Sequence, residues 1–403
     1  MGSNPLALVT CSGRDTPGIT ARLTGILADA DRRIVDIGQS VLHGWLSLSL
    51  LFEVEPNASN DPSPIPLLRK TAAELGLRIE TTIWGRGDLA GGTAPKPRTN
   101  HYALTLMAAT IPARTLHQVT RYLAEKSLHI DFIERLSEGG FGCVEMLVSS
   151  ERQLDESLIK AELLAIARNE GVDIALQAEG LFRRAKRLIV FDMDSTLIQS
   201  EIIDEFAREL GVYDEVARVT HEAMSGRIPF AEALRQRVAR LRGLTQAQVD
   251  AVFARTKITP GAEELIGTLK ELGYRVALIS GGFTCIADRL KSRLGLHYAH
   301  ANQLIFENGV CTGELLPPIV DARGKAELLE RIARQEGIRL DQVIAVGDGA
   351  NDIPMLEKAG LGIAFNAKPS VGERADLALN QQNLQAILYL LGIPGRDLPK
   401  TLA

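Results

Sequence analysis

Cysteine is scarce in this sequence. Only four cysteines occur among 403 residues, and they lie far apart at Cys11, Cys143, Cys285 and Cys311. This spacing excludes a C-x-x-C metal or redox site and argues against a disulfide framework. We expect reduced thiols that pack in hydrophobic cores.

Long apolar runs and strong net charge are also missing. No run approaches the roughly 20 apolar residues that span a bilayer, and the N-terminus has no basic region followed by an apolar stretch. The formal net charge is -5, which gives no general attraction to nucleic acid or anionic lipid. We therefore expect a cytoplasmic protein without a membrane or nucleic-acid partner, in which any anion site is local.

The composition is that of a soluble globular protein, with 45% hydrophobic and 24% charged residues. A chain of 403 residues is too long for one ordinary core. We expect two to three domains.

The first half contains a weak internal repeat. Each copy has the predicted order strand, helix, strand, strand, helix, strand. The first copy is predicted at 6–10, 19–27, 34–42, 45–50, 65–75 and 78–84, and the second at 101–108, 112–126, 130–136, 142–149, 154–168 and 172–177. A stretch rich in glycine and proline separates them, as a linker does. We predict domains at 1–85 and 100–180, with a linker at 86–99.

This repeated unit resembles the ACT domain, a small ligand-sensing module of amino-acid enzymes. The most specific piece is the turn from Asp15 to Gly18, because backbone N–H groups at the start of a helix can bind a small anionic ligand. The matching loop of the second copy, 109–113, lacks both the Asp and the Gly. Two roles stay open for the repeat: sensing of an amino acid such as serine, and pairing of subunits through sheet edges into a homodimer or higher oligomer. The basic cluster at 183–187 is predicted to be a solvated connector.

A short apolar run at 188–191 ends in Asp192 and Asp194. Such a run is typical of a buried parallel strand, and ligands bind beyond the carboxyl ends of these strands. Two carboxylates so close repel each other unless a cation lies between them. Mg²⁺ removes this conflict and leaves an aspartate able to act as a nucleophile or proton carrier. Taken alone, the pattern also fits a helix-capping Asx turn.

Two further strand ends carry polar residues. One is Ser280 followed by Gly281 and Gly282, where a hydroxyl and free backbone N–H groups suit a phosphate. The other is the segment from Asp348 to Asp352. Between them Lys325 begins a predicted helix, from which its ammonium could reach inward. Alternation of strands and helices after residue 187 predicts a parallel sheet with helices on both faces.

This ordered set of four motifs resembles the haloacid dehalogenase superfamily of phosphotransferases. The resemblance implies that Asp192 is the nucleophile and Asp194 the acid and base. Mg²⁺ would be held by Asp192, the backbone carbonyl of Asp194 and Asp348, with Asp352 supporting the metal shell. The phosphoryl group would be bound by Lys325, Ser280 and the N–H of Gly281.

An insertion at about 200–262 has helical periodicity and would form a cap that excludes water. Within it, the sequence motifs at 201–204, 224–226 and 229–230 stand together with Arg237. This set resembles the phosphoserine phosphatase family, and so does the whole catalytic part at 186–403. The resemblance implies that Glu201 binds the substrate ammonium and Arg237 its carboxylate. It also implies an apolar wall of Met224 and Phe230 and a phosphate contact from Asn351.

The predicted fold is therefore an α/β haloacid dehalogenase-like domain with a helical cap, preceded by two α+β ACT-like domains. The implied activity is the magnesium-dependent hydrolysis of O-phospho-L-serine to L-serine and phosphate through an aspartyl-phosphate, the last step of serine biosynthesis. Two alternatives stay open. One is a phosphatase of another small phospho-amino acid, and the other is a regulatory protein that binds amino acids or phosphate.

Overall fold

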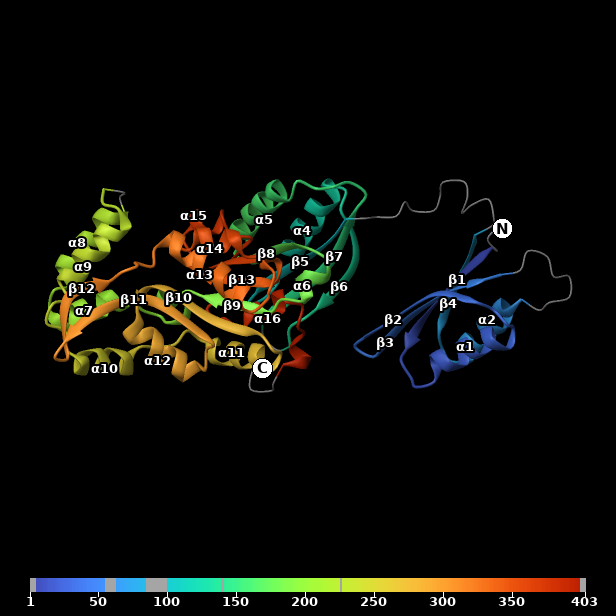
Figure 1. The fold of residues 1–403 in the computed structure, drawn as a ribbon. Helices are drawn as coiled ribbons and strands as arrows, with labels where there is room; N and C mark the ends of the chain where they lie inside the picture. The colour runs from blue at the N-terminus through green and yellow to red at the C-terminus, as the bar shows by residue number, and fades with distance from the viewer. Residues whose placement is uncertain (1–4, 55–62, 85–99, 139–140, 225–226, 399–403) are drawn as a thin grey trace. The chain divides into compact units, whose positions relative to one another are not determined.

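The computed structural model describes residues 5–54, 63–84, 100–138, 141–224 and 227–398. They form two compact units, one ending at Pro97 and the other beginning at Arg98 (Figure 1). The predicted linker at 86–99 lies outside the described residues. No helix in the described part of the chain is long and apolar enough to span a bilayer.

The first unit is a four-stranded antiparallel sheet with two helices. Its elements are β1 (Leu6–Arg14), α1 (Ile19–Asp29), β2 (Ile34–Leu42), β3 (Trp45–Glu53), α2 (Pro64–Glu74) and β4 (Arg78–Trp84). The spatial order is β2-β3-β1-β4. In β3 the leucines at 46, 48 and 50 are buried while the residues between them are exposed or half-buried, because one face of the sheet packs against the helices. All of β2 is exposed at the sheet edge.

The second repeat has the same topology. Its elements are β5 (Asn100–Ala108), α4 (Ala113–Glu125), β6 (His129–Arg135), β7 (Gly142–Ser150), α5 (Glu156–Glu170) and β8 (Asp173–Ala178). The order β6-β7-β5-β8 repeats that of the first sheet. The predicted strand and helix order is confirmed in both copies.

The second repeat differs from the first because its sheet is buried on both faces. Leu104 and Met146 lie in a core formed with α4 and α5. Met107, Cys143 and Ala175 belong to the core of the C-terminal part. The sheet therefore lies between its own helices and the C-terminal part of the chain.

Two residues of the basic cluster at 183–187 are buried, Arg183 and Lys186, whereas Arg184 and Arg187 are exposed. The Arg183 side chain forms ion pairs with Glu145 and, at 2.8 Å, with Glu179. The ammonium of Lys186 donates to backbone carbonyls of the C-terminal part at 2.7 and 2.9 Å. The prediction of a solvated connector is wrong for these two residues. Arg183 is buried against acidic side chains of the second repeat and its C-terminal end, and Lys186 is buried against the backbone of the C-terminal part.

The C-terminal part is built on a seven-stranded sheet. Its elements are α6 (Leu181–Arg184), β9 (Leu188–Phe191), η1 (Met193–Leu197), α7 (Ile202–Leu210), α8 (Tyr213–Met224), α9 (Phe230–Ala239), α10 (Gln246–Arg255), α11 (Ala262–Glu271), β10 (Arg275–Phe283), α12 (Thr284–Leu294), β11 (Tyr298–Glu307), β12 (Val310–Leu316), α13 (Ala322–Gln335), η2 (Leu340–Gln342), β13 (Val343–Gly347), α14 (Ile353–Lys358), β14 (Leu361–Phe365), α15 (Pro369–Gly372), β15 (Leu377–Leu379), α16 (Ala386–Leu390) and η3 (Gly395–Asp397). The order is β12-β11-β10-β9-β13-β14-β15. Only β12 pairs antiparallel to its neighbour.

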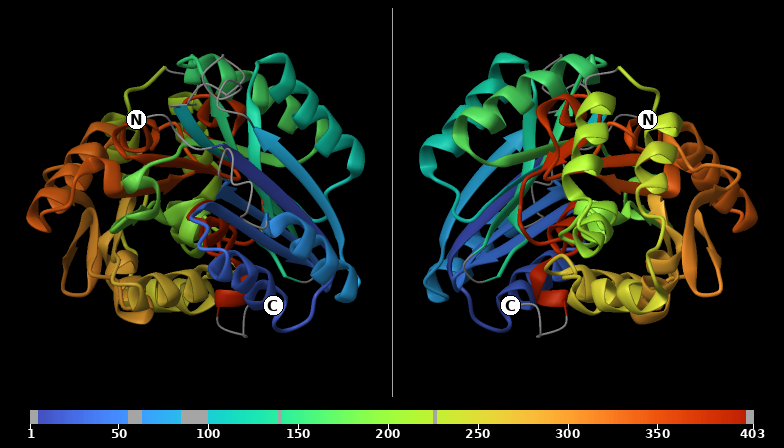
Figure 2. Two further views of the ribbon diagram at one scale, coloured as in Figure 1. Left: turned by 90° about the vertical axis from the view of Figure 1, so that its right-hand side faces the viewer. Right: turned by 90° about the vertical axis from the view of Figure 1, so that its left-hand side faces the viewer.

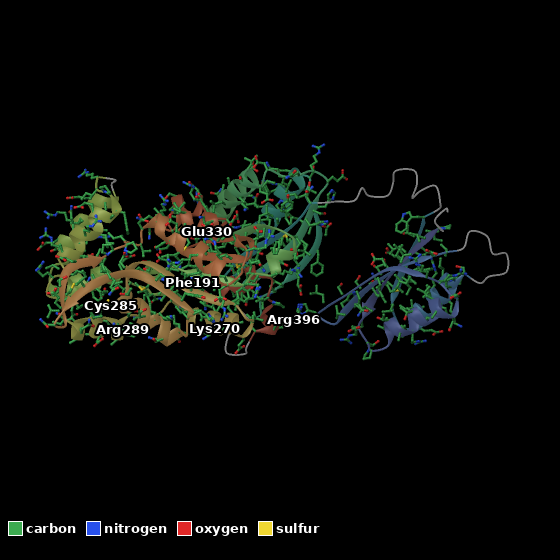
Figure 3. All side chains as sticks on the ribbon, viewed as in Figure 1. Phe191, Lys270, Cys285, Arg289, Glu330 and Arg396 are labelled. Carbon is green, nitrogen blue, oxygen red and sulfur yellow. The ribbon has the colours of Figure 1, made fainter. Side chains whose placement is uncertain are left out.

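Helices cover both faces of this sheet. Leu188 and Val190 pack with α13 and α14, while Ile189 and Phe191 face the core that includes α11 and α12. Figure 2 shows α10, α11 and α12 along one side of the sheet, and Figure 3 shows Phe191 inside this part of the molecule. The apolar run at 188–191 is thus a central strand buried on both faces, as predicted.

The four helices of the predicted cap, α7 to α10, lie between β9 and β10 in the sequence. They pack against one another and against β12. Two backbone hydrogen bonds join the segment between α9 and α10 to β12, from the Gly243 N–H to the Cys311 carbonyl and from the Cys311 N–H to the Leu244 carbonyl. The cap therefore rests on the hairpin of β11 and β12.

Candidate active site

The loop after β9 positions the two aspartates of the D-x-D motif. The N–H of Asp192 donates to the carbonyl of Val346 on β13 at 2.9 Å, and the Met193 N–H donates to Asp192 Oδ1 at 2.7 Å. Ser195 then adopts left-handed backbone angles with φ 56°, which turns the chain toward the cap. Asp192 is held by the backbone at the carboxyl end of the central strand.

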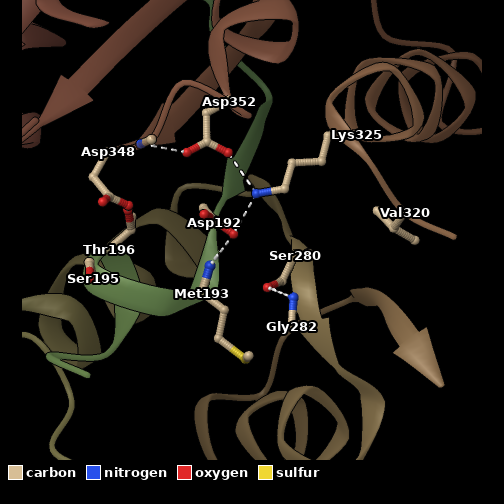
Figure 4. A network of polar contacts seen from close by, with 12 residues as sticks. Asp192, Met193, Ser195, Thr196, Ser280, Gly282, Val320, Lys325, Asp348 and Asp352 are labelled. Atoms are coloured by element: carbon tan, nitrogen blue, oxygen red, sulfur yellow. Dashed lines mark hydrogen bonds and ion pairs between the residues drawn. The ribbon is translucent and has the colours of Figure 1, made fainter. Parts of the chain in front are cut away.

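Lys325 joins two strand ends. Its side chain is fully buried, and its ammonium lies 2.8 Å from Asp192 Oδ1 and 2.7 Å from Asp352 Oδ1 (Figure 4). The start of α13 is fixed by Asp321, whose carboxylate accepts the Gly324 N–H at 2.8 Å. A buried lysine is stable only with close counter-charges, and here two carboxylates supply them.

Three carboxylates cluster at this point. Oxygen atoms of Asp192, Asp348 and Asp352 lie within 4.8 Å of one another. The Thr196 hydroxyl donates to Asp348 Oδ1 at 3.1 Å, and Oδ2 of Asp348 does not take part in this hydrogen bond. With every carboxylate ionised and Lys325 protonated, the cluster carries a net charge of about -2. Hard oxygen ligands with this charge fit Mg²⁺.

The pKa values reflect this crowding. Burial, reinforced by Asp352 and opposed by Lys325, raises the pKa of Asp192 to about 8. Burial and Asp352 raise the pKa of Asp348 to about 7, against the hydrogen bond from Thr196. Burial alone would lower the pKa of Lys325, but the carboxylates outweigh it and the pKa is raised. Without a divalent cation the site keeps its ammonium and favours protonated carboxyl groups.

Asp194 occupies a drier position than a surface carboxyl group. Burial, followed by the charges of Glu201 and Asp192, raises its pKa well above the ordinary value. The Ile202 N–H donates to Asp194 Oδ1 at 2.9 Å. Its other oxygen, Oδ2, lies 2.8 Å from the position that a Cβ on Gly282 would take. A glycine is therefore required where the second strand end approaches Asp194.

The loop at Ser280–Gly282 is a bulge at the end of β10. Ile279 pairs with His300 and Phe283 pairs with Asn302, so three residues of β10 lie opposite one residue of β11. Ser280 is buried, and its hydroxyl accepts the Gly282 N–H at 2.8 Å. Bulges are frequent next to active sites, where they re-aim a side chain or end the strand pairing.

The cap contributes two charged residues near Asp194. Glu201 accepts a hydrogen bond from the Ser195 hydroxyl at 2.9 Å. Arg237 lies on α9, where burial lowers its pKa against the charges of Glu201, Asp204 and Asp194. Its Nε is buried and has no hydrogen-bond partner among the described residues.

The structure shows fewer contacts for the other predicted site residues. The ring tip of Phe230 lies 3.5 Å from the Cβ position of Gly281, and Asn351 lies beside Gly349 in the loop after β13. The Met224 side chain lies outside the described residues. In the first unit Asp15 is exposed and Gly18 has φ 96° at the start of α1.

Three polar residues of the site were missed by the sequence reasoning. Thr196 bonds Asp348, and its own carbonyl accepts the Thr259 hydroxyl at 2.7 Å. The Asn302 side chain donates to the carbonyl of Gly281 and accepts the Val320 N–H. The position of Thr196 within the D-x-D-S-T motif could have signalled its role, whereas Thr259 and Asn302 have no local pattern.

Comparisons with known proteins show the families that this chain resembles. The sequence model of the haloacid dehalogenase-like hydrolase family matches residues 186–360. Two sequence models of the ACT domain match residues 6–82 and 100–177. A solved haloacid dehalogenase family hydrolase from Salmonella enterica serovar Typhi is 29% identical, with a TM-score of 0.63, and the match covers 72% of this chain and 98% of that one. The fold is that of a haloacid dehalogenase-like hydrolase carrying two ACT domains, as predicted.

Two curated relatives extend over nearly the whole chain. The phosphoserine phosphatase of Streptomyces coelicolor is 43% identical over 390 residues, 96% of this chain and 92% of its own. Phosphoserine phosphatase SerB2 of Mycobacterium tuberculosis is 38% identical over 387 residues, 96% of this chain and 93% of its own. The chain belongs to the phosphoserine phosphatase family, which confirms the family predicted from the sequence.

The raised pKa values give a prediction for stability. Between about pH 4 and pH 7 the unfolded chain has lost the protons that Asp192 and Asp348 keep when folded, so raising the pH destabilises the protein without Mg²⁺. Mg²⁺ binds the ionised carboxylates and offsets this loss. The rise in thermal unfolding midpoint on adding Mg²⁺ should therefore be larger at about pH 8 than at about pH 5.5.

Asp348→Asn should lose most of this pH-dependent difference, whereas Asp214→Asn, an exposed residue on α8, should keep it. An effect of Mg²⁺ that is equal at both pH values would contradict the assignment.

Proposed function

We propose that this chain hydrolyses O-phospho-L-serine to L-serine and phosphate with Mg²⁺, through an aspartyl-phosphate formed on Asp192, as the last step of serine biosynthesis. The observation that supports it most directly is the contact of Lys325 with Asp192 and Asp352 beside Asp348. Phosphoryl transfer needs a nucleophile and positive charge at one point, and this cluster offers both.

In the proposed first step Asp192 attacks phosphorus. Its Oδ1 is held by Met193 N–H and by Lys325, which leaves Oδ2 as the attacking atom. The bond from Oδ2 to phosphorus forms while the bond from phosphorus to the serine oxygen breaks. Lys325, Ser280 and the N–H of Gly281 neutralise the phosphoryl oxygens.

Asp194 carries the proton in both steps. Its raised pKa favours the protonated form, which donates to the departing serine oxygen. The carboxylate that remains then accepts a proton from the water that attacks the phosphorus of the aspartyl-phosphate. Phosphate leaves and Asp192 is regenerated.

Mg²⁺ would be held by Asp192, Asp348 and the backbone carbonyl of Asp194, and when bound it supplies positive charge to the phosphoryl oxygens. Asp352 supports this arrangement through water and through its ion pair with Lys325.

Recognition of the amino acid is assigned to the cap. Glu201 binds the substrate ammonium, and Arg237 binds the carboxylate with its planar guanidinium. The unpartnered Nε of Arg237 supports this role, because a buried donor without a partner costs free energy until a ligand satisfies it. Met224 and Phe230 form the apolar wall, and Asn351 contacts the phosphate side.

Replacement of the nucleophile tests the activity. Asp192→Asn should reduce magnesium-dependent phosphate release from phosphoserine by roughly a thousandfold or more, because an amide cannot form the covalent intermediate. Asp214→Asn is the matched control on the exposed surface of α8. Phosphate release that survives in Asp192→Asn would exclude the mechanism, and a wild-type chain inert toward phosphoserine would exclude the substrate.

The amino-acid clamp gives a separate prediction. Arg237→Ala should lower kcat/KM for phosphoserine by about 30- to 100-fold, mainly through KM, because one charge-assisted contact is lost. Hydrolysis of p-nitrophenyl phosphate, which has no carboxylate, should change by less than about threefold. Arg235→Ala, exposed on the same helix, should match the wild type on both substrates. Equal losses of Arg237→Ala on both substrates would contradict the clamp.

The first ACT domain is assigned a serine-binding turn at Asp15–Gly18 and a role in forming a homodimer or higher oligomer. The left-handed Gly18 and the exposed edge strand β2 support these roles. Arg237→Ala is the background for this test, because it weakens serine binding at the catalytic site. Calorimetric titration of Arg237→Ala with serine should still give a heat of binding. The double variant Arg237→Ala with Asp15→Ala should lose that heat of binding. Loss of all heat in Arg237→Ala alone would contradict the effector site.

The proposed oligomer is tested by light scattering. The measured mass should exceed that of one chain, and a monomer would contradict the oligomer.

A further inference from the structure

We propose that Asn302 is a positioning residue that holds the phosphate-binding loop Ser280–Gly282 in register with the start of α13, which carries Lys325. The inference rests on the proposed function, because it concerns the phosphoryl-binding groups of that site. Asn302 itself lies on β11 and belongs to none of the four motifs.

The bulge creates a need for a side-chain donor. Within the described residues, Ser280–Gly282 pairs with neither neighbouring strand. The pairing of β10 with β9 ends at Leu278, and its pairing with β11 passes from Ile279 directly to Phe283. The carbonyl of Gly281 therefore lacks a ladder partner. Asn302 Nδ2 donates to this carbonyl at 2.8 Å, which fixes the plane of the peptide that follows Gly281.

The same amide binds a second segment. Asn302 Oδ1 accepts the Val320 N–H at 2.7 Å, and Nδ2 also reaches the Val320 carbonyl at 3.4 Å. Val320 directly precedes Asp321, which begins α13 and accepts the Lys325 N–H with its backbone carbonyl at 2.9 Å. A single side chain thus touches both the loop and the segment that leads into Lys325 (Figure 4 shows Ser280, Gly282, Val320 and Lys325).

The chemistry of this position requires an amide. Asn302 is buried, so every donor and acceptor around it needs a partner. An acceptor must face the Val320 N–H and a donor must face the Gly281 carbonyl, and an asparagine offers one of each at fixed separation. A leucine of similar shape leaves these groups unsatisfied, and an aspartate places a carboxylate against a carbonyl.

The consequence concerns geometry rather than contact with substrate. Ser280 and the Gly281 N–H must reach the same phosphoryl group as Lys325, although they belong to different segments. A small displacement between catalytic groups can cost a large factor in rate. For residues that bind a metal, loss of the hydrogen bond that orients them typically costs about 10- to 100-fold, and we expect an effect of the same order here. The amide of Asn302 forms hydrogen bonds with both of these segments, at Gly281 and at Val320.

The test uses the full chain with Mg²⁺ and the variant Asn302→Leu. We expect kcat/KM to fall about 10- to 100-fold, by the same factor for phosphoserine and for p-nitrophenyl phosphate, since both present the same phosphoryl group. Calorimetry should show inorganic phosphate binding weakened by about tenfold. Gln303→Ala changes the neighbouring exposed amide on β11 and should behave as the wild type in each measurement.

A merely structural role would lower the unfolding midpoint but leave phosphate affinity and kcat/KM unchanged below that temperature, and this result would overturn the inference. Unequal losses on the two substrates would also overturn it. If Asn302→Leu does not fold, Asn302→Asp retains the acceptor for Val320 and loses the donor to Gly281, so it should show the same equal loss. Wild-type protein that binds phosphate but does not hydrolyse phosphoserine would refute the proposed substrate while the phosphate measurement still tests Asn302.

Discussion

The burial of one ammonium group among carboxylates organises the catalytic part of this protein. Lys325 is covered completely, and its charge is tolerated there because Asp192 and Asp352 lie within ion-pair distance. These two carboxylates come from the ends of β9 and the loop after β13, so the lysine requires the neighbouring strands and α13 to meet at one edge of the sheet. A divalent cation would offset the surplus of negative charge that remains at this edge, which would otherwise repel an anionic phosphoryl group.

The sequence was most informative where a function depends on a short stretch of chain. The run before Asp192 and the strictly spaced polar residues after three strands predicted a parallel sheet and its functional edge, because side-chain chemistry and strand burial are both local there. It was least informative about contacts between distant segments. Nothing near Arg183 signals that it is covered by the second repeat, and nothing near Asn302 signals that a bulge in another strand needs its amide. One local sign of the burial of the second sheet was available. The sequence of β5 is apolar almost throughout, as expected for a strand buried on both faces, whereas apolar and polar residues alternate in much of β3.

The cap and the carboxylate cluster are connected by a short chain of hydrogen bonds. Thr259, in the segment where the chain returns from the cap, donates to the carbonyl of Thr196, and Thr196 donates to Asp348. The segment on the other side of the cap begins at Asp194, which accepts the N–H of Ile202 at the start of α7. Both connections of the cap therefore end on residues of the D-x-D loop or on its hydrogen-bond partners, which explains how an inserted helical layer keeps a defined place above the strand ends.

The two ACT sheets share a topology but not an environment, and this difference constrains how the protein can change. The outer face of the second sheet shares a core with the hydrolase, where Phe141 stacks on Tyr389 with ring centroids 5.9 Å apart. A chain that began at β9 would leave these apolar groups in water, a liability for solubility. In evolutionary terms the first module has a core of its own to maintain, whereas substitutions on the outer face of the second sheet have to stay compatible with the hydrolase surface that this face covers.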